Sequence, residues 1–211
     1  MRYFLISIVF VLFSCGSNPV KGLSPLPSEV SSFKNPYFSD AATDYVYKAN
    51  LSVHGHELSG IVIFKKIAEK THRVVFTTEF GNRLIDFEVS PDDFKMNYIV
   101  DDLNRKMLIN ILRDDFHLLL RREFLITGQY ETADTKILNS KSGNKSYLLY
   151  IPKDGERLSE LRFVEGTKEK IRIGFTPEND TFADRIQIHH SNIKLTIDLN
   201  HLKPSTSTQT P

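Results

Sequence analysis

Apolar and polar residues alternate along most of this chain, and a period of two limits it to strands that bury one face. In segment 44–53 the residues that share a face are Tyr45, Tyr47, Ala49, Leu51 and Val53. The same alternation, or in 58–66 an almost continuous apolar run, predicts strands at 58–66, 72–80, 83–89, 124–130, 135–139, 147–151, 160–165, 170–175, 185–190 and 194–199, with 94–100 as one further short candidate. Short turns such as Gly81-Asn82 separate them, so we expect about nine to eleven antiparallel strands.

One stretch breaks this alternation. From Leu103 to about Leu120 apolar residues recur at spacings of three and four, which predicts an amphipathic helix. Asp101-Asp102 precede it and Arg121-Arg122 follow it, the charges that favour the two ends of a helix dipole. A long sheet must close, pair or curl to cover its apolar face. We therefore expect a mainly β (α+β) fold, a curled antiparallel sheet or half-barrel with the helix at about 103–120 on its concave side.

Composition argues against several classes of protein. Cys15 is the single cysteine, so no disulfide can form within the chain and the fold depends on its core. Apolar residues make up 40% of the chain, which is enough for one substantial core. Lys and Arg number 27 and Asp and Glu number 26. This near balance argues against nucleic-acid binding and against a polybasic membrane role.

Residues 1–15 have the pattern of a bacterial lipoprotein signal peptide. Arg2 precedes an apolar run, Tyr3–Phe13, which is shorter than the roughly 20 residues that cross a bilayer. The run leads into Leu12-Phe13-Ser14-Cys15-Gly16, which resembles a lipobox. That resemblance implies a diacylglycerol on the sulfur of Cys15 and an acyl chain such as palmitate on the new amino terminus. The alternative is an ordinary signal peptide with an incidental cysteine.

The residues after the cysteine bear on localisation and on domain boundaries. No Asp follows Cys15 and no acidic run comes after it, so the resemblance implies an outer-membrane lipoprotein on the periplasmic face of the cell envelope. Segment 16–36 is rich in Ser, Pro, Asn and Gly, which predicts a flexible tether. We expect a single β domain at 37–202 and a disordered tail at 203–211.

Several stretches of the domain resemble one envelope family. Tyr47–Val53 and Leu58–Lys65 are similar to its opening hairpin, in which a Gly starts the second strand, and Thr77–Asp86 is similar to the strand–Gly–strand that follows. Arg185–His190 and Lys194–Leu199 resemble its last hairpin. Together with the lipobox, these stretches make the chain similar to the LolA/LolB-like family of bacterial envelope lipoproteins, as a divergent branch.

This resemblance implies a half-open barrel whose hydrophobic cavity accepts the acyl chains of a lipid or lipoprotein in outer-membrane biogenesis. The residues expected to line the cavity are Val62, Phe64, Val74, Phe76, Ile85, Phe87, Met107 and Ile111. The alternative is that these side chains pack on one another as a dry core. The half-barrel would then be a scaffold in a non-enzymatic interaction subunit of an envelope protein complex. The partners expected are therefore the membrane, a lipid or lipoprotein ligand, and an envelope protein.

Polar groupings give little support for an enzyme. His54, His56 and Glu57 could hold zinc, but a single His-x-His in a turn is a weak signal. Asp114 and His117 share a helix face, as acid–base pairs and ordinary surface pairs both do. The chain has no nucleophile elbow, phosphate loop or dinucleotide fingerprint. We therefore expect no enzymatic activity, no cofactor, no metal and no nucleic-acid partner.

Overall fold

A computed structural model describes residues 18–53, 56–155 and 157–203 of the chain. The expected signal peptide with Cys15, and residues 204–211 of the expected tail, lie outside these ranges. The strands are β1 (Ser32–Lys34), β2 (Asp44–Val53), β3 (His56–Ala68), β4 (Thr71–Thr77), β5 (Arg83–Val89), β6 (Phe94–Ile99), β7 (Glu123–Leu125), β8 (Gly128–Glu131), β9 (Thr135–Ser142), β10 (Lys145–Pro152), β11 (Glu160–Glu165), β12 (Lys168–Pro177), β13 (Ala183–His190) and β14 (Leu195–His201). The helices are a 3-10 turn, η1 (Asp101–Leu103), and α1 (Lys106–Leu119).

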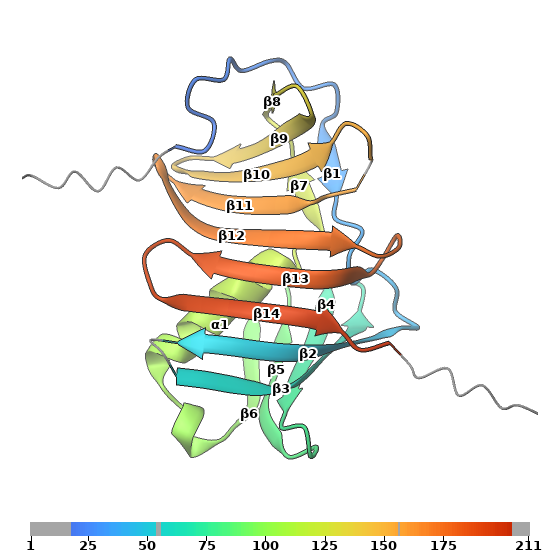
Figure 1. Cartoon of the computed structure of the whole chain (residues 1–211), viewed down its shortest axis with the longest axis vertical. Helices are drawn as coiled ribbons and strands as arrows, with labels where there is room; N and C mark the ends of the chain where they lie inside the picture. The colour runs from blue at the N-terminus through green and yellow to red at the C-terminus, as the bar shows by residue number, and fades with distance from the viewer. Residues whose placement is uncertain (1–17, 54–55, 156, 204–211) are drawn as a thin grey trace, which may run out of the picture.

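Twelve of these strands form one antiparallel sheet in the order β6-β5-β4-β3-β2-β14-β13-β12-β11-β10-β9-β8. Each neighbouring pair is consecutive in the chain except β2 and β14, where Leu51 faces Ile197. This long-range pairing joins the meander β2–β6 to the meander β8–β14. The sheet curls without closing, because the edge strands β6 and β8 do not pair with each other (Figure 1). The predicted half-barrel with one helix is confirmed.

The predicted elements match the observed ones within a few residues, with four differences. Segment 78–80 is a turn rather than the end of a strand, and segment 124–130 divides into β7 and β8. Strand β1 was not predicted, so the described residues hold more strands than the nine to eleven expected. The helix begins at Lys106 rather than near Leu103, because Asp101–Leu103 forms a 3-10 turn and Arg105 has an extended backbone.

The alternation of β2 shows how the sheet divides its two faces. Tyr45, Tyr47 and Ala49 are buried on the concave face, and Lys48 and Asn50 are exposed on the convex face. The buried set continues across the sheet, strand by strand, in β3, β4, β5, β12, β13 and β14. The main core of the protein therefore lies on the concave side.

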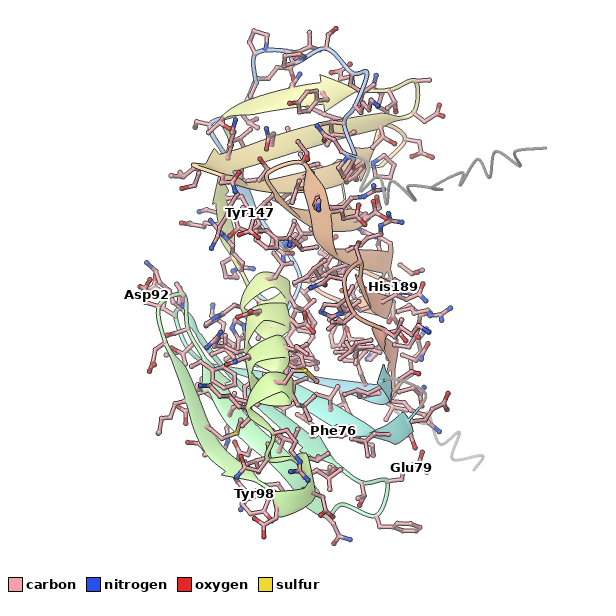
Figure 2. All side chains as sticks on the ribbon, turned by 90° about the vertical axis from the view of Figure 1, so that its left-hand side faces the viewer. Phe76, Glu79, Asp92, Tyr98, Tyr147 and His189 are labelled. Atoms are coloured by element: carbon pink, nitrogen blue, oxygen red, sulfur yellow. The ribbon has the colours of Figure 1, made fainter. Side chains whose placement is uncertain are left out.

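Helix α1 lies across this concave face, in the angle between β3–β6 and β12–β14 (Figure 2). The ring of Phe116 lies 5.7 Å from that of Phe64 and 5.2 Å from that of Phe87. Leu112 and Leu119, one turn on either side of Phe116, are also buried. The predicted apolar stripe thus covers the sheet. Within the described ranges, no helix is both long and apolar enough to cross a membrane.

The segment before β2 packs against the sheet further along. Strand β1 pairs with β7, with Phe33 opposite Phe124, and Leu26 forms a bridge with Gln129 of β8. This differs from the flexible tether expected for 16–36, because from Leu26 onward the segment exchanges backbone hydrogen bonds with the domain. The Ser- and Pro-rich composition of the segment gave no sign of these contacts, because they depend on residues of the domain that are distant in sequence.

Asn35 connects this amino-terminal segment to the end of α1. Its side-chain Nδ2 donates to the carbonyl oxygens of Leu119 and Arg121, at 3.4 and 3.3 Å, and its Oδ1 accepts from the backbone N–H of Tyr37 at 3.1 Å. The bond to Leu119 satisfies a carbonyl that the helix leaves free at its last turn, and the bond to Arg121 holds the segment that follows. The carboxyl end of α1 is therefore fixed by a residue far away in sequence.

Candidate functional site

An apolar cavity lies between the concave face and α1. It is lined solely by apolar side chains, which are Ala49, Leu51, Val62, Val74, Phe76, Ile85, Phe87, Leu112, Phe116, Ile197 and Leu199. Its volume is about 20 Å³, which is room for about one water molecule. A water there would find no polar partner among these side chains, so the cavity is dry in this closed state.

One small residue, Ala49, borders the cavity, and a second small residue faces it on the next strand. Ala49 of β2 is opposite Gly60 of β3 and, on its other side, Leu199 of β14. A Cβ at Gly60 would collide with the carbonyl oxygen of Thr77, so only glycine fits there without a shift of the backbone. Ala49 has no such restriction on its inner side, and a longer side chain there would enter the cavity.

The two ends of α1 are held differently. At the amino end, Arg105 makes no side-chain capping bond and Met107 is 59% exposed. The buried residues of the helix begin only at Leu112. At the carboxyl end Leu119 is fully buried and its carbonyl is held by Asn35. The first turns of α1 are therefore the part that can move with the smallest loss of packing.

A buried ionisable pair joins the middle of α1 to the sheet. Asp115 Oδ1 lies 2.8 Å from Nε2 of His190, the last residue of β13, and the two side chains are 0% and 5% exposed. The other ring nitrogen of His190 lies 3.3 Å from the carbonyl oxygen of Leu195. Asp115 Oδ2 accepts no hydrogen bond from a described residue. The pair is thus a buried polar contact between α1 and β13 within an otherwise apolar interface.

Burial and mutual contact shift the protonation of both partners. Burial raises the pKa of the Asp115 carboxyl, and His190 partly opposes that shift. Burial disfavours the charged form of His190, but the hydrogen bond and charge of Asp115 raise the pKa of that imidazole overall. Both shifts act to keep one proton on the pair while α1 is closed.

The structure places the expected lining residues in three environments. Val62, Val74, Phe76, Ile85 and Phe87 line the cavity. Phe64 is beside it in the core, with its ring 4.8 Å from that of Phe38. Met107 is exposed and Ile111 is half-buried. Neither lines the cavity, because the helix starts late and reaches the cavity only with Leu112 and Phe116.

Six lining residues were missed from the sequence. Ala49 and Leu51 share the alternation of β2, and Leu112 and Phe116 share the helical spacing, so their signals were present. Ile197 and Leu199 could not be assigned to the cavity, because only the pairing of β14 with β2 brings them there. The Asp115–His190 contact was also missed, since it joins residues 75 positions apart.

The polar groupings considered from the sequence do not form a common site among the described residues. The turn at 54–55 and the side chain of His56 lie outside the described residues. Asp114 pairs with Arg113 at 3.0 Å, whereas His117 Nε2 lies 3.2 Å from the carbonyl oxygen of Asp93. The two helix residues are therefore engaged with different partners and form no acid–base pair.

A further polar cluster lies near the carboxyl end of the described chain. Ligand atoms of Glu178, Asp184 and His201 lie within 4.8 Å of one another. The Lys203 ammonium lies 3.0 Å from Asp184 and 3.4 Å from Glu178. One of the two negative charges of this cluster is thus offset by a cation of the chain itself.

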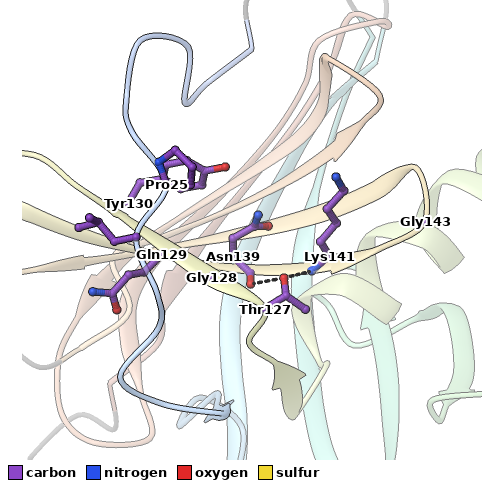
Figure 3. A pocket seen from close by; sticks show the side chains of 9 residues that line it. Pro25, Thr127, Gly128, Gln129, Tyr130, Asn139, Lys141 and Gly143 are labelled. Carbon is purple, nitrogen blue, oxygen red and sulfur yellow. Dashed lines mark hydrogen bonds between the residues drawn. The ribbon is translucent and has the colours of Figure 1, made fainter.

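A second hollow lies at the far end of the sheet, beside β8 and β9 (Figure 3). It has a volume of about 430 Å³ and is lined by Pro25, Leu26, Thr127, Gly128, Gln129, Tyr130, Asn139, Lys141 and Gly143. The Thr127 hydroxyl donates to the carbonyl oxygen of Asn139 at 3.1 Å and accepts from the Lys141 N–H at 3.2 Å. We call this hollow the β8 groove. Its wall combines the polar groups of Thr127, Asn139 and Lys141 with the apolar side chains of Pro25 and Leu26.

Comparisons with known proteins add the following. No family model matches the chain, and no curated protein matches it. Solved structures similar to it include a LolA superfamily protein from Nitrosomonas europaea, with 10% identity, a TM-score of 0.48 and coverage of 79% of this chain and 87% of that one. A putative outer membrane lipoprotein-sorting protein domain from Vibrio parahaemolyticus has 8% identity, a TM-score of 0.43 and coverage of 80% and 87%. A DUF1329 family protein from Desulfovibrio piger has 9% identity, a TM-score of 0.40 and coverage of 76% and 84%.

Each of these likenesses has an identity of 10% or less and a TM-score below 0.5. Function depends on the site and not on the fold, so what the chain binds has to follow from its own cavity and contacts.

Proposed function

We propose that the protein binds an acyl chain of a lipid or lipoprotein between its curled sheet and α1. We further propose that Cys15 anchors it to the periplasmic face of a bacterial outer membrane. The observation that carries the proposal is the cavity under α1, which has only apolar side chains in its wall. A concave apolar site with one movable side suits a flexible hydrocarbon chain.

The cavity has to widen before a chain can enter. At about 20 Å³ it has room for no more than about one water molecule, whereas an acyl chain needs many times that volume. Movement of the first turns of α1 would carry Leu112 away from the sheet and enlarge it. Each methylene buried from water contributes about 0.8 kcal/mol, so a long chain can offset the helix packing that is lost.

The small volume also favours a second candidate function. If α1 never opens, the half-barrel is a filled scaffold, and the protein acts as a non-enzymatic interaction subunit of an envelope complex. In that case apolar ligands would find no site under α1. The two candidates therefore differ in one measurable property, which is binding of an acyl chain by the purified domain.

Titration of a fluorescent fatty acid into a soluble chain that begins at Gly16 tests the proposal. Ala49→Leu extends a side chain into the cavity and should weaken binding at least about tenfold, because it removes room for roughly two methylenes. Asn50→Leu is the matched control. It adds an apolar side chain at the next position of β2, on the exposed convex face, and should leave the affinity unchanged.

Two results would contradict acyl binding and favour the scaffold. One is a wild-type protein that does not bind the fatty acid. The other is an Ala49→Leu protein that binds as well as the wild type while its urea midpoint confirms that it is folded. Hydrogen exchange gives an independent readout, since the amides of residues 108–111 should exchange faster than those of 116–119 and should be the ones that respond to the fatty acid.

The proposed anchor has its own test. The intact mass of the mature protein from bacterial membranes should correspond to a chain that begins at Cys15 and carries lipid. In Cys15→Ser the lipid-modified mass should be absent. The protein should also no longer need detergent to be released from the membranes. An unmodified chain that is fully extracted by salt would contradict the lipid anchor without affecting the proposal for the cavity.

A further inference from the structure

The described chain begins on the convex face of the sheet, at the end that contains β8–β11. Asn18 starts a turn that is closed by hydrogen bonds from the N–H groups of Lys21 and Val20, at 3.0 and 3.2 Å. Val20 and Leu23 then pack on a small apolar cluster of the convex face that consists of Ile137, Leu148 and Val164. The segment that follows Cys15 is thus fastened to one particular end of the domain from its first described residues.

Chain length then limits where a lipid anchor can be. Cys15 and Asn18 are three residues apart, and an extended chain of that length spans at most about 10 Å. If Cys15 is held in a bilayer surface, as proposed above, the β8–β11 end of the domain lies within about that distance of the lipid headgroups. The turn that contains Glu79 is at the other end of the molecule (Figure 2) and would face away from the membrane.

Lysines gather at the turns beside this amino-terminal segment. Lys141 and Lys145 lie on either side of the turn between β9 and β10. Lys168 begins β12, directly after the turn between β11 and β12. The two turns are joined by a hydrogen bond from the Gly166 N–H to the Asn144 carbonyl, at 2.8 Å. The described chain starts beside them (Figure 1).

We call the set Lys21, Lys141, Lys145 and Lys168 the basic end. All four side chains are exposed, and none forms an ion pair with a described residue. The acid that lies among them, Glu165, is paired with Lys170 at 3.6 Å. Although the whole chain has a net charge of only +1, the fold leaves uncompensated positive charge at the end that is nearest the anchor.

The β8 groove opens next to the basic end. Lys141 belongs to both, and Pro25 and Leu26 form the opposite wall of the groove. Leu26 is 43% exposed. The Oδ1 atom of Asn139 is buried in the wall without a hydrogen-bond partner among the described residues. A hollow of about 430 Å³ with an ammonium, an amide and an apolar rim has the chemistry of a phospholipid headgroup site.

We propose that the basic end and the β8 groove form a second lipid contact, at which the domain rests on an anionic phospholipid surface beside its own anchor. The occupant is the headgroup layer of the bilayer that holds Cys15. This proposal rests on the anchor proposed above for its geometry, whereas its charge argument concerns the folded domain alone. It sets the orientation of the protein, with the β8–β11 end at the membrane and the β4–β5 turn away from it.

The first test uses the full lipidated chain in vesicles of phosphatidylethanolamine and phosphatidylglycerol. A fluorophore is placed on Ser142→Cys, at the end of β9 beside the β9–β10 turn, or on Phe80→Cys, in the β4–β5 turn, since Cys15 is blocked by lipid. Headgroup-spin-labelled lipid should quench the label at 142 several-fold more than the label at 80. Equal quenching, or stronger quenching at 80, would overturn the orientation.

The second test does not depend on the anchor. A chain that begins at Gly16 should sediment with phosphatidylglycerol vesicles and not with phosphatidylcholine vesicles, and added salt should weaken the binding. Lys141→Glu with Lys168→Glu should weaken it at least about tenfold. Lys70→Glu with Lys106→Glu makes the same change in charge at two exposed lysines outside the basic end and should leave it nearly unchanged. Equal losses in the two double variants would show attraction by net charge alone and overturn the site.

The outcomes separate this inference from the proposed anchor. A full-length protein that fails to float with vesicles, while the soluble chain still selects phosphatidylglycerol through Lys141 and Lys168, contradicts the anchor and supports the basic end. A full-length protein that floats, while the label at 142 is unquenched and the charge reversals have no effect, supports the anchor and overturns the basic end.

Discussion

Asp115 of α1 and His190 of β13 form a 2.8 Å contact in which both side chains are almost fully buried. The contact lies between Leu112 and Leu119, the apolar residues with which α1 covers the sheet. An unpaired charge in such surroundings is costly, whereas a hydrogen-bonded pair is tolerated. The pair therefore holds the middle of the helix to β13 as long as both partners are in place.

Replacing His190 with Ala should lower the free energy of unfolding by about 3 kcal/mol or more at neutral pH. The reason is that the substitution leaves the Asp115 carboxylate buried without its partner. Urea denaturation measures the change. The neighbouring His189→Ala is the control, because His189 is exposed on the convex face and its loss should change stability by no more than about 0.5 kcal/mol. Equal effects of the two substitutions would contradict a stabilising contact between Asp115 and His190.

The same pair makes stability depend on pH. Because the folded pKa of His190 is raised above its unfolded value, its contribution is fully present below about pH 6.5 and is lost as the pH rises through the folded pKa. We expect the free energy of unfolding to fall as the pH rises above about 6.5. The double variant Asp115→Asn with His190→Gln should abolish this fall. A fall that persists in the double variant would assign it to other groups.

His72 should produce the opposite trend on the acid side. Burial lowers the pKa of its imidazole, whose Nε2–H donates to the carbonyl oxygen of Phe38 at 2.9 Å. Protonation is then favoured in the unfolded chain, so stability should decrease as the pH falls below about 6.5. His72→Gln should remove this part of the pH profile and leave the alkaline part unchanged. Urea midpoints across the range measure both.

Gly60→Ala should destabilise the protein by about 1–3 kcal/mol, because the added methyl group collides with the backbone of Thr77 at the cavity. Gly174→Ala is the matched control. It also lies within a strand, and a Cβ there meets no atom within 4 Å, so the substitution should be neutral or slightly stabilising. A tolerated Gly60→Ala would show that β3 and β4 can separate at this point.

Removal of the amino-terminal segment should lower stability as well. A chain that begins at Tyr37 lacks β1 and the Asn35 bonds to the end of α1, whereas a chain that begins at Gly16 keeps both. Asn35→Ala alone should cost about 1–3 kcal/mol, since it leaves buried carbonyls without a donor. Equal urea midpoints for the two truncated chains would show that segment 16–36 does not stabilise the domain and acts only as a tether.

Much of the secondary structure could be predicted from the sequence, because local patterns carry it. The period of two in Asp44–Val53 and the spacing of three and four from Met107 to Leu119 are set by how each element buries one side. The prediction failed where local pattern was absent. Strand β1 has only three residues, and the break between β7 and β8 follows from pairing with different partners.

The candidate site was predicted in outline only. Val62, Val74 and Phe76 were assigned to the cavity because they share the inner face of neighbouring strands. Met107 was wrongly placed there, since helical spacing gives the face of a helix but not the turn at which it meets the sheet. Its side chain is 59% exposed, although that of its neighbour Leu108 packs against the core.

The sequence by itself determined that this chain forms a curled antiparallel sheet with one amphipathic helix on its inner side. The reason is that strand and helix periods depend on neighbours a few residues apart. Only the tertiary structure decided that β14 closes on β2, that Asp115 meets His190, and that lysines 120 or more positions from Lys21 lie near it at one end. Those contacts join distant segments, and they depend on which packing of all the strands buries the most apolar surface with its polar groups paired.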